Sequence, residues 1–319
     1  MVDDWHAGDL LGAYVLEACS PEEARQVAEH ADGCATCAGE IATLRRPAEW
    51  LGVSTARAPA PALRARVLAA ARAARPAGSR SLTDFYRAQV AELDGLLGDL
   101  SLPLWQLPSR PHPSVRRLME HLYGNDELVA TAAGLDTPPL GPGAPPADVH
   151  RHWRQQAGAL IERIDRTDGR LLDRPVRLAG RRVVERPLRE ALVQRGFETW
   201  IHAEDVRRVL HLPPRDPGAE PLAAIVTFAL RLLPAALAAA GRAHPGRAID
   251  LVLTGPGGGS REAPLAPGTN SDVVARIELP AAVFCRLLAG RVSAPDAVVT
   301  GDATAAGDFL AVAATMGCD

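Results

Sequence analysis

The feature that most constrains this chain is a short cluster of metal-binding side chains near its start. His30, Cys34 and Cys37 follow one another in the pattern His-x3-Cys-x2-Cys. Zinc binds imidazole nitrogen and thiolate sulfur at about 2.0–2.3 Å, and two cysteines spaced in this way can present both sulfurs to one ion. A closed structural site needs a fourth ligand, for which His6 and Cys19 are the upstream candidates. The spacing therefore predicts a small unit stabilised by a metal.

The helices expected around this cluster favour His6 as the fourth ligand. Residues 5–18 and 21–30 have the pattern of two helices, and a third is expected at about 38–50. An antiparallel arrangement of the first two would bring His6, at the start of one, close to His30, at the end of the other. The other candidate lies in the loop at the opposite end of that pair. We therefore expect four ligands for a structural zinc: His6, His30, Cys34 and Cys37.

Composition excludes several classes of protein. Two of the five cysteines lie in the cluster, which indicates metal ligation in a reducing compartment and not a disulfide framework. The net charge is −3 and the arginines are interspersed with acidic residues, so nucleic-acid binding has little electrostatic support. The first residues lack the pattern of a signal peptide. The apolar run Leu222–Ala240 contains Arg231 and Pro234, which favours a buried core helix over a membrane span. We expect a cytoplasmic protein without a nucleic-acid or membrane partner.

Four features occur together in residues 1 to about 75: Gly12-Ala13-Tyr14-Val15-Leu16, Ser20-Pro21-Glu22-Glu23, the His30-Cys34-Cys37 pattern and a strongly helical stretch at Leu63–Ala74. With them this part of the chain resembles the zinc-binding anti-sigma domain of bacterial anti-sigma factors. The resemblance implies a helical bundle that holds zinc and, with the helix after it, binds an extracytoplasmic-function (ECF) sigma factor and blocks its access to RNA polymerase. Many relatives continue into a transmembrane helix, which we do not expect here, so the signal would be read inside the cell.

A second candidate metal site lies further along the chain. Residues 189–210 are predicted to form a long helix, on which Glu198 and His202 lie four residues apart and hence on one face. A carboxylate and an imidazole at this spacing form half of a metal site, and His121 on the helix expected at 115–133 would complete a set of three ligands. Spacing alone is a weak signal, because an exposed polar pair on a helix has the same pattern.

Two longer motifs strengthen this second site: Ser114-Val115-x-x-Leu118-x-x-His121-Leu122 and Glu198-x-x-x-His202-x-x-Asp205-Val206-Arg207-Arg208. With them residues 81 to about 215 resemble the DinB-like four-helix bundle of the mycothiol-dependent maleylpyruvate isomerase family. The resemblance implies that His121, Glu198 and His202 bind a divalent metal, usually zinc, beside an open position for a low-molecular-weight thiol such as mycothiol. It also implies that Asp205 contacts these ligands, and helps to orient them, without binding the metal itself.

The chain departs from that family at one place. The family has Gly-Trp just before the first histidine helix, whereas this chain has Pro111-His112-Pro113. We expect the departure to leave the three ligands in place. It puts in doubt only the pocket for substrate or thiol beside them.

The residues after about 240 change to a mixed pattern. Two strands and two helices are predicted there: Ala248–Thr254, Val273–Leu279, Ala281–Ala289 and Ala303–Met316. The run Gly255–Gly259 is predicted to be a hairpin loop, because neither a helix nor a lysine follows it as a phosphate-binding loop would require. This tail resembles the C-terminal domain of the same isomerase family, which has a sterol-carrier-like shape. Cys285 lies among apolar residues and is expected to be buried, and no role is expected for Cys318.

Together these observations predict a mainly α protein in three parts. Residues 1–76 would form a small zinc-binding helical bundle, residues 77–215 a DinB-like metal-binding four-helix bundle, and residues 216–319 an α+β sterol-carrier-like domain. One function that follows is a soluble cytoplasmic anti-sigma factor that sequesters an ECF sigma factor and whose isomerase-like body senses a small molecule or thiol. The alternative is a mycothiol-dependent isomerase or thiol S-transferase with an appended zinc module. For the N-terminal cluster itself, a purely structural zinc and an oxidation-sensitive cysteine pair remain open.

Overall fold

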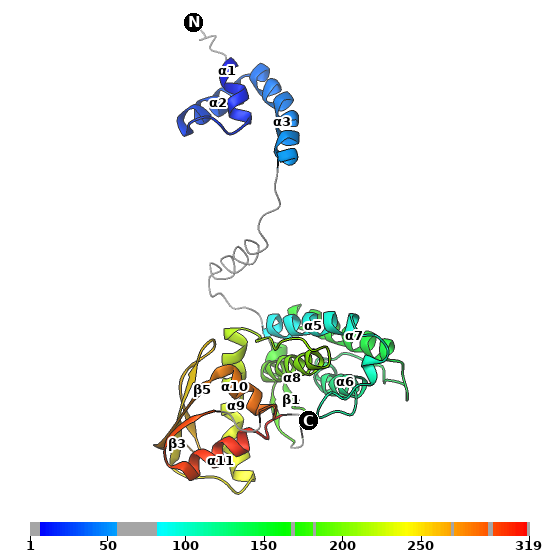
Figure 1. The fold of residues 1–319 in the computed structure, drawn as a ribbon, viewed down its shortest axis with the longest axis vertical. Helices are drawn as coiled ribbons and strands as arrows, with labels where there is room; N and C mark the ends of the chain where they lie inside the picture. The colour runs from blue at the N-terminus through cyan, green and yellow to red at the C-terminus, as the bar shows by residue number, and fades with distance from the viewer. Residues whose placement is uncertain are drawn as a thin grey trace. The chain divides into compact units, whose positions relative to one another are not determined.

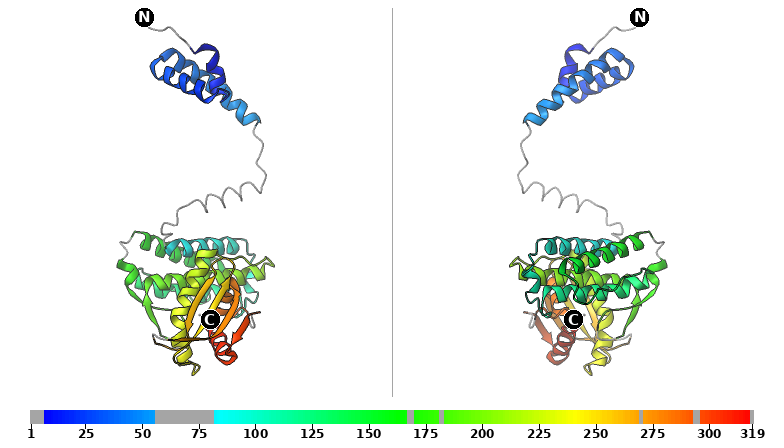
Figure 2. Two further views of the ribbon diagram at one scale, coloured as in Figure 1. Left: turned by 90° about the vertical axis from the view of Figure 1, so that its left-hand side faces the viewer. Right: turned by 90° about the vertical axis from the view of Figure 1, so that its right-hand side faces the viewer.

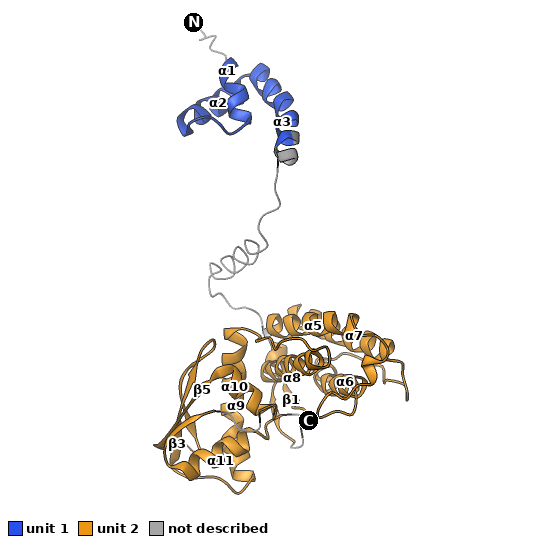
Figure 3. Cartoon of the chain, viewed as in Figure 1, with its two compact units in different colours: residues 1–78 blue, residues 79–319 orange. Residues whose placement is uncertain are grey.

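The computed structural model describes residues 7–55, 82–166, 170–180, 183–268, 271–292 and 296–317. Within these ranges the chain is mainly helical with a small sheet region. It divides into two compact units, unit 1 with residues 1–78 and unit 2 with residues 79–319 (Figure 3). His6 and the helix expected at 63–74 lie outside the described residues, as does Cys318. The division of unit 2 into two domains near residue 215 stays a prediction.

The described residues of unit 1, 7–55, form three helices, shown in blue in Figure 1: α1 (Gly8–Val15), α2 (Pro21–Gly33) and α3 (Ala35–Thr55). Helix α2 begins with a capping box, in which the Ser20 hydroxyl accepts a hydrogen bond from the Glu23 N–H and the Glu23 carboxylate accepts one from the Ser20 N–H. The predicted start of α3 near residue 38 was wrong. Its first helical hydrogen bond runs from the Ala38 N–H to the Cys34 carbonyl at 3.0 Å, so α3 begins directly after Cys34.

Within residues 7–55 the hydrophobic core of unit 1 is small. Its buried residues are Ala7, Leu11, Val27, Cys37 and Ile41. Small units seldom bury enough apolar surface to offset the conformational entropy lost on folding, and a bound metal is one common way to make up the difference. One of the predicted zinc ligands is thus part of the core itself.

Four helices of unit 2 pack on one another: α5 (Leu82–Gly98), α6 (Val115–Ala132), α7 (Pro146–Asp165) and α8 (Leu188–Val209). Helices α5 and α6 each contact both α7 and α8, as the two side views of Figure 2 allow the reader to follow. Helix α8 is buried on all sides along most of its length, including the charged residues Glu190, Arg195, Glu198, Glu204 and Asp205. Its bounds and those of α6 agree with prediction to within one residue, and the Ser114 hydroxyl caps α6 by accepting from the Arg117 N–H at 3.2 Å.

Short elements connect these helices. The 3-10 helix η1 (Leu104–Gln106) precedes α6, and η2 (Arg170–Asp173) follows α7. Strands β1 (Pro175–Arg177) and β2 (Glu185–Pro187) pair antiparallel before α8.

The rest of unit 2 is a four-stranded sheet with three helices. The strands are β3 (Arg247–Thr254), β4 (Gly259–Pro264), β5 (Asp272–Pro280) and β6 (Val298–Gly301), in the order β4-β3-β5-β6. Strands β3 and β5 run parallel, and the two outer strands pair antiparallel with them. The central pair was predicted, and the glycine run does form the β3–β4 hairpin loop. Prediction missed both edge strands, because β4 is mostly polar and β6 is only four residues long, so that each becomes a strand only by pairing with a neighbour.

The helices of this part are α9 (Ala219–Ala239), α10 (Ala281–Leu288) and α11 (Ala303–Ala313). Within the described residues, α9 alone is long and apolar enough to cross a membrane by length and composition. Its apolar face lies in the same core as the sheet and the four-helix part, through Leu222, Ile225, Val226, Phe228, Ala229, Leu233 and Leu237. Arg231 on the same helix forms an ion pair with Glu190 of α8 at 2.7 Å. Helix α9 therefore packs as a core helix, as the sequence indicated.

Candidate functional site

The first cluster lies where α2 ends and α3 begins. His30 is in the last turn of α2, Cys34 is the residue between the helices, and Cys37 is in the first turn of α3. One imidazole nitrogen and the two sulfurs all lie within 4.8 Å of one another. A donor set of two thiolates and an imidazole suits zinc. The structure thus brings together three of the four predicted ligands.

The two cysteines have different electrostatic surroundings. Hydrogen bonding to the backbone N–H of Cys37, at the start of α3, lowers the pKa of the Cys34 thiol. Burial raises the pKa of the Cys37 thiol, although the backbone N–H of Ala7 opposes this by hydrogen bonding to its sulfur. Ala7, the residue directly after His6 in the sequence, therefore lies beside the Cys37 sulfur. Cys19 is not in the cluster, and its thiol lies 3.8 Å from the Leu10 carbonyl oxygen.

A second cluster lies within unit 2. It joins His121 of α6 and His202 of α8 with His112, which precedes α6, and one nitrogen from each ring lies within 4.8 Å of the others. The ring centroids are 4.7 Å apart for His112 and His121, and 5.5 Å apart for each of the other two pairs. Three convergent imidazoles are a donor set that binds zinc and related divalent metals. We call these three residues the histidine cluster.

Prediction missed His112, although the sequence carried a signal. From the sequence, the segment Pro111-His112-Pro113, which differs from the isomerase family, is expected to affect only the pocket beside the metal. The structure instead places His112 in the histidine cluster. Backbone hydrogen bonds hold this segment, from the His112 N–H to the Ser109 carbonyl at 2.7 Å and from the Ser109 N–H to the His112 carbonyl at 3.1 Å. Because His112 lies in a loop, no helical spacing in the sequence relates it to the other two histidines.

Glu198, the third predicted ligand, is buried but is not a member of the histidine cluster. Its carboxylate accepts hydrogen bonds from the Arg195 guanidinium at 2.5 Å and from the Asn125 side-chain amide at 3.1 Å. The same Asn125 nitrogen lies 3.0 Å from His121 Nε2. Glu198 is thus linked to His121 of the histidine cluster through the side-chain amide of Asn125. The exposed helix pair considered from spacing is wrong, because Glu198 and His202 are only 4% and 2% exposed.

Behind Glu198, a polar network continues through the four-helix core. Arg195 is fully buried and also contacts Asp126 at 3.2 Å, and Asp126 in turn accepts hydrogen bonds from Tyr86 at 2.8 Å and Trp153 at 3.1 Å. Burial raises the pKa of Asp126 to about 6 even though Arg195 acts in the opposite direction. Burial and the neighbouring Asp126 likewise raise the pKa of Tyr86.

Asp205, on the same helix as His202, supports the His202 ring. The Asp205 carboxylate lies 3.2 Å from His202 Nδ1 and accepts a hydrogen bond from Arg291 at 2.6 Å, and it also pairs with Arg208. Burial alone would raise the pKa of Asp205, but hydrogen bonds from His202 and Arg291 outweigh it and hold the pKa below its ordinary value. An ionised Asp205 that accepts a hydrogen bond from the Nδ1–H leaves the Nε2 lone pair of His202 available to a metal.

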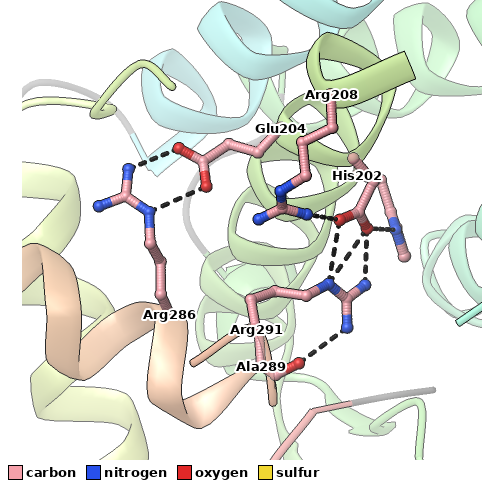
Figure 4. Close-up of polar contacts among 7 residues, drawn as sticks. His202, Glu204, Arg208, Arg286, Ala289 and Arg291 are labelled. Carbon is pink, nitrogen blue, oxygen red and sulfur yellow. Dashed lines mark hydrogen bonds and ion pairs between the residues drawn. The ribbon is translucent and has the colours of Figure 1, made fainter. Parts of the chain in front are cut away.

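Arg291, from the C-terminal part of unit 2, is thus linked to the histidine cluster through Asp205. Arg286 of α10 binds the Glu204 carboxylate of α8 through two nitrogens, at 2.9 and 2.5 Å, and lies over the Trp200 ring at 5.3 Å (Figure 4). This double contact fixes the end of α10 on α8, five residues before Arg291. Sequence reasoning found Asp205 but had no means to find its arginine partner.

Comparison with known proteins gives two findings. Residues 6–38 match the family model described as "Putative zinc-finger". Two solved structures resemble the chain, the crystal structure of the mycothiol-dependent maleylpyruvate isomerase and that of a single-residue mutant of it, at 18% and 17% identity. Each covers 69% of this chain and 91% of the isomerase chain, with a TM-score of 0.48. No curated protein matches the chain significantly. The zinc-finger resemblance expected for the N-terminal residues thus has a matching family model.

Proposed function

We propose that this protein is a zinc-containing anti-sigma factor, in which unit 1 binds an ECF sigma factor and unit 2 is a metal-binding sensor. The observation that carries the proposal is the cluster of His30, Cys34 and Cys37, which lies inside the stretch that matches the zinc-finger family. In this proposal His6 is the fourth ligand, since Ala7, the next residue, hydrogen bonds to Cys37. Zinc would then hold the start of α1, the end of α2 and the start of α3 together.

The finer assignments belong to the same proposal. Residues 77–215 would be a DinB-like bundle and residues 216–319 a sterol-carrier-like domain, and the protein would act in the cytoplasm. The histidine cluster would hold the second divalent metal, and a small molecule or thiol bound there would be the signal that changes sigma-factor binding. Asp205 and Arg291 support this role, because they fix the orientation of His202.

Binding to purified sigma factors tests this function. The zinc-loaded full-length protein is mixed with each ECF sigma factor of its genome, and complexes are sought by size-exclusion chromatography and by inhibition of transcription in vitro. We expect one sigma factor to bind, and we expect Cys34→Ser to abolish the complex while Cys19→Ser, a matched change outside the cluster, preserves it. Failure of every sigma factor to bind the zinc-loaded protein would contradict the proposal.

A second function is favoured by the histidine cluster, namely a thiol-dependent isomerase or S-transferase that carries an appended zinc module. A divalent metal bound there would lower the pKa of a thiol and hold it as the more nucleophilic thiolate. The chain itself contributes the orientation of His202 through Asp205 and the amide of Asn125 beside His121. Mycothiol, which the isomerase of similar structure requires by its name, is the first thiol to test.

Activity measurements separate this second function from the first. Thiol-dependent isomerisation and thiol transfer are measured for the wild type, for His121→Asn and for His150→Asn. His150 is a matched control because it lies on α7 and contacts Asp94 at 2.7 Å, outside the cluster. Loss of activity in His121→Asn alone supports the enzyme, whereas equal activity in all three proteins contradicts it.

A further inference from the structure

The histidine cluster differs from the predicted ligand set at one position, and this difference carries an inference. We propose that His112, and not Glu198, is the third protein ligand of the central metal, and that Glu198 instead balances the charge of Arg195. The central site would then have three neutral ligands: His112, His121 and His202. The inference rests on the proposed central metal site and concerns its composition.

The geometry of the three imidazoles is the first argument. His112, His121 and His202 come from a loop and two helices, yet one nitrogen of each lies within 4.8 Å of the others. Nitrogens that share one zinc ion at about 2.0–2.1 Å are at most about 4 Å apart, so small side-chain rotations bring these three to one ion. His112 is held for this role by its two backbone hydrogen bonds with Ser109.

The surroundings of Glu198 are the second argument. Both of its carboxylate oxygens are engaged, one by Arg195 and the other by Asn125. Arg195 is fully buried between two carboxylates, those of Glu198 and Asp126. Removing one partner from a buried ion pair is strongly destabilising, because an uncompensated charge stays behind in a medium of low polarity. Moving Glu198 to the metal would therefore cost the core one of the two charges that balance Arg195.

This ligand set decides what the central site binds best. A divalent ion with three neutral histidines keeps its full charge of about +2, whereas a carboxylate ligand would reduce it to about +1. Coulomb attraction for an anion at the open position rises accordingly. The class of ligand expected there is a small anion, such as a thiolate.

X-ray absorption spectroscopy of the zinc-loaded protein tests the ligand set directly. The sample is the full-length chain with Cys34→Ser and Cys37→Ser, so that zinc occupies only the central site; both substitutions lie in unit 1, whereas the central site lies in unit 2. Three imidazoles around the zinc, and no protein carboxylate, are expected. Two imidazoles and a carboxylate would overturn the inference and leave the central metal site itself standing.

Metal affinity of single variants gives a second, independent readout. Competition with a chromophoric chelator is expected to show a loss of at least about 100-fold in zinc affinity for His112→Asn, and a smaller loss, of about tenfold, for Glu198→Gln. His150→Asn is the control and should bind zinc as the wild type does. A larger loss in Glu198→Gln than in His112→Asn, with both variants folded by circular dichroism, would overturn the inference. Unchanged affinity in His121→Asn and His202→Asn would instead refute the central metal site.

The preference for an anion has its own measurement. Azide is added to the same protein loaded with cobalt(II), whose visible absorption reports on the ligands of the ion. We expect the absorption of the wild type to change at lower azide concentration than that of a variant in which Asp replaces His112 (His112→Asp), because the carboxylate lowers the charge of the site. Equal azide affinity in the two proteins would contradict the anion preference.

Discussion

Individual charged residues inside the four-helix part of unit 2 define its interior. Two of the buried charges near the cluster have a partner on another element: Arg195 pairs with Asp126 of α6, and Asp205 pairs with Arg291 after α10. Buried ion pairs contribute little net stability compared with apolar residues of the same size, because desolvation offsets the attraction. Their value here lies in fixing which side chains face the histidine cluster.

Asp126 leads to a prediction on pH. Its pKa is raised to about 6 in the folded protein, well above its ordinary value, so the folded state takes up a proton before the unfolded state does. The free energy of unfolding should therefore gain a contribution as the pH falls from 7 to 5, and lose it again as the pH rises through about 6. We expect a gain on the order of 1 kcal/mol.

Urea denaturation of the wild type and of Asp126→Asn at pH 5, 6 and 7 measures this contribution. The amide cannot titrate, so the difference between the two proteins should move in favour of the wild type as the pH is lowered. Asp250→Asn is a suitable control, because Asp250 is paired with Arg276 at the surface and its pKa is lowered. A difference that is independent of pH would show that Asp126 stays ionised throughout.

At the level of the helices, the close packing of α5 on α8 depends on a glycine. A Cβ atom added at Gly196 of α8 would lie 2.6 Å from Cε1 of Phe85 on α5. The absence of a side chain there lets the ring of Phe85 rest on the backbone of α8. Since α8 also carries Glu198 and His202, this contact helps to set the position of the helix that supplies the cluster.

Alanine substitutions at two glycines test this contact. We expect Gly196→Ala to lower the free energy of unfolding by about 1–3 kcal/mol, because the added methyl group overpacks the interface. Gly95→Ala on α5 meets no atom within 4 Å and should raise stability by about 0.5–1 kcal/mol through the better helix propensity of alanine. Thermal unfolding of both variants measures these changes in stability. A Gly196→Ala variant that is as stable as the wild type, or more stable, would show that Phe85 moves aside at no cost in free energy.

At the level of the whole molecule, the two units should depend on metal to different degrees. The described residues of unit 1 have a core of five buried side chains, one of which is Cys37, whereas unit 2 has an extensive core shared by its helices and its sheet. In small zinc modules the metal contributes roughly 10–16 kcal/mol of apparent binding free energy, which is also free energy of folding. Because unit 2 has an extensive core, we expect it to fold without a bound metal.

Chelation therefore separates the units. We expect removal of zinc to unfold α1, α2 and α3 and to leave the secondary structure of unit 2 intact, as followed by hydrogen exchange of backbone amides. Cys37→Ser should give the same pattern without a chelator. Exchange protection of α2 that survives in the metal-free protein would contradict a zinc-dependent fold for unit 1.

What the sequence determined by itself is local. The His30-Cys34-Cys37 cluster, the capping box at Ser20 and the bounds of α6 and α8 follow from residue spacing and from short-range hydrogen bonds, and the structure reproduces them. Helical spacing also placed Glu198 and His202 on one face, but it does not specify which long-range partner a carboxylate prefers. That choice depends on the tertiary structure, because Asn125 and His112 lie on other segments of the chain and reach the site only after those segments have packed against α8.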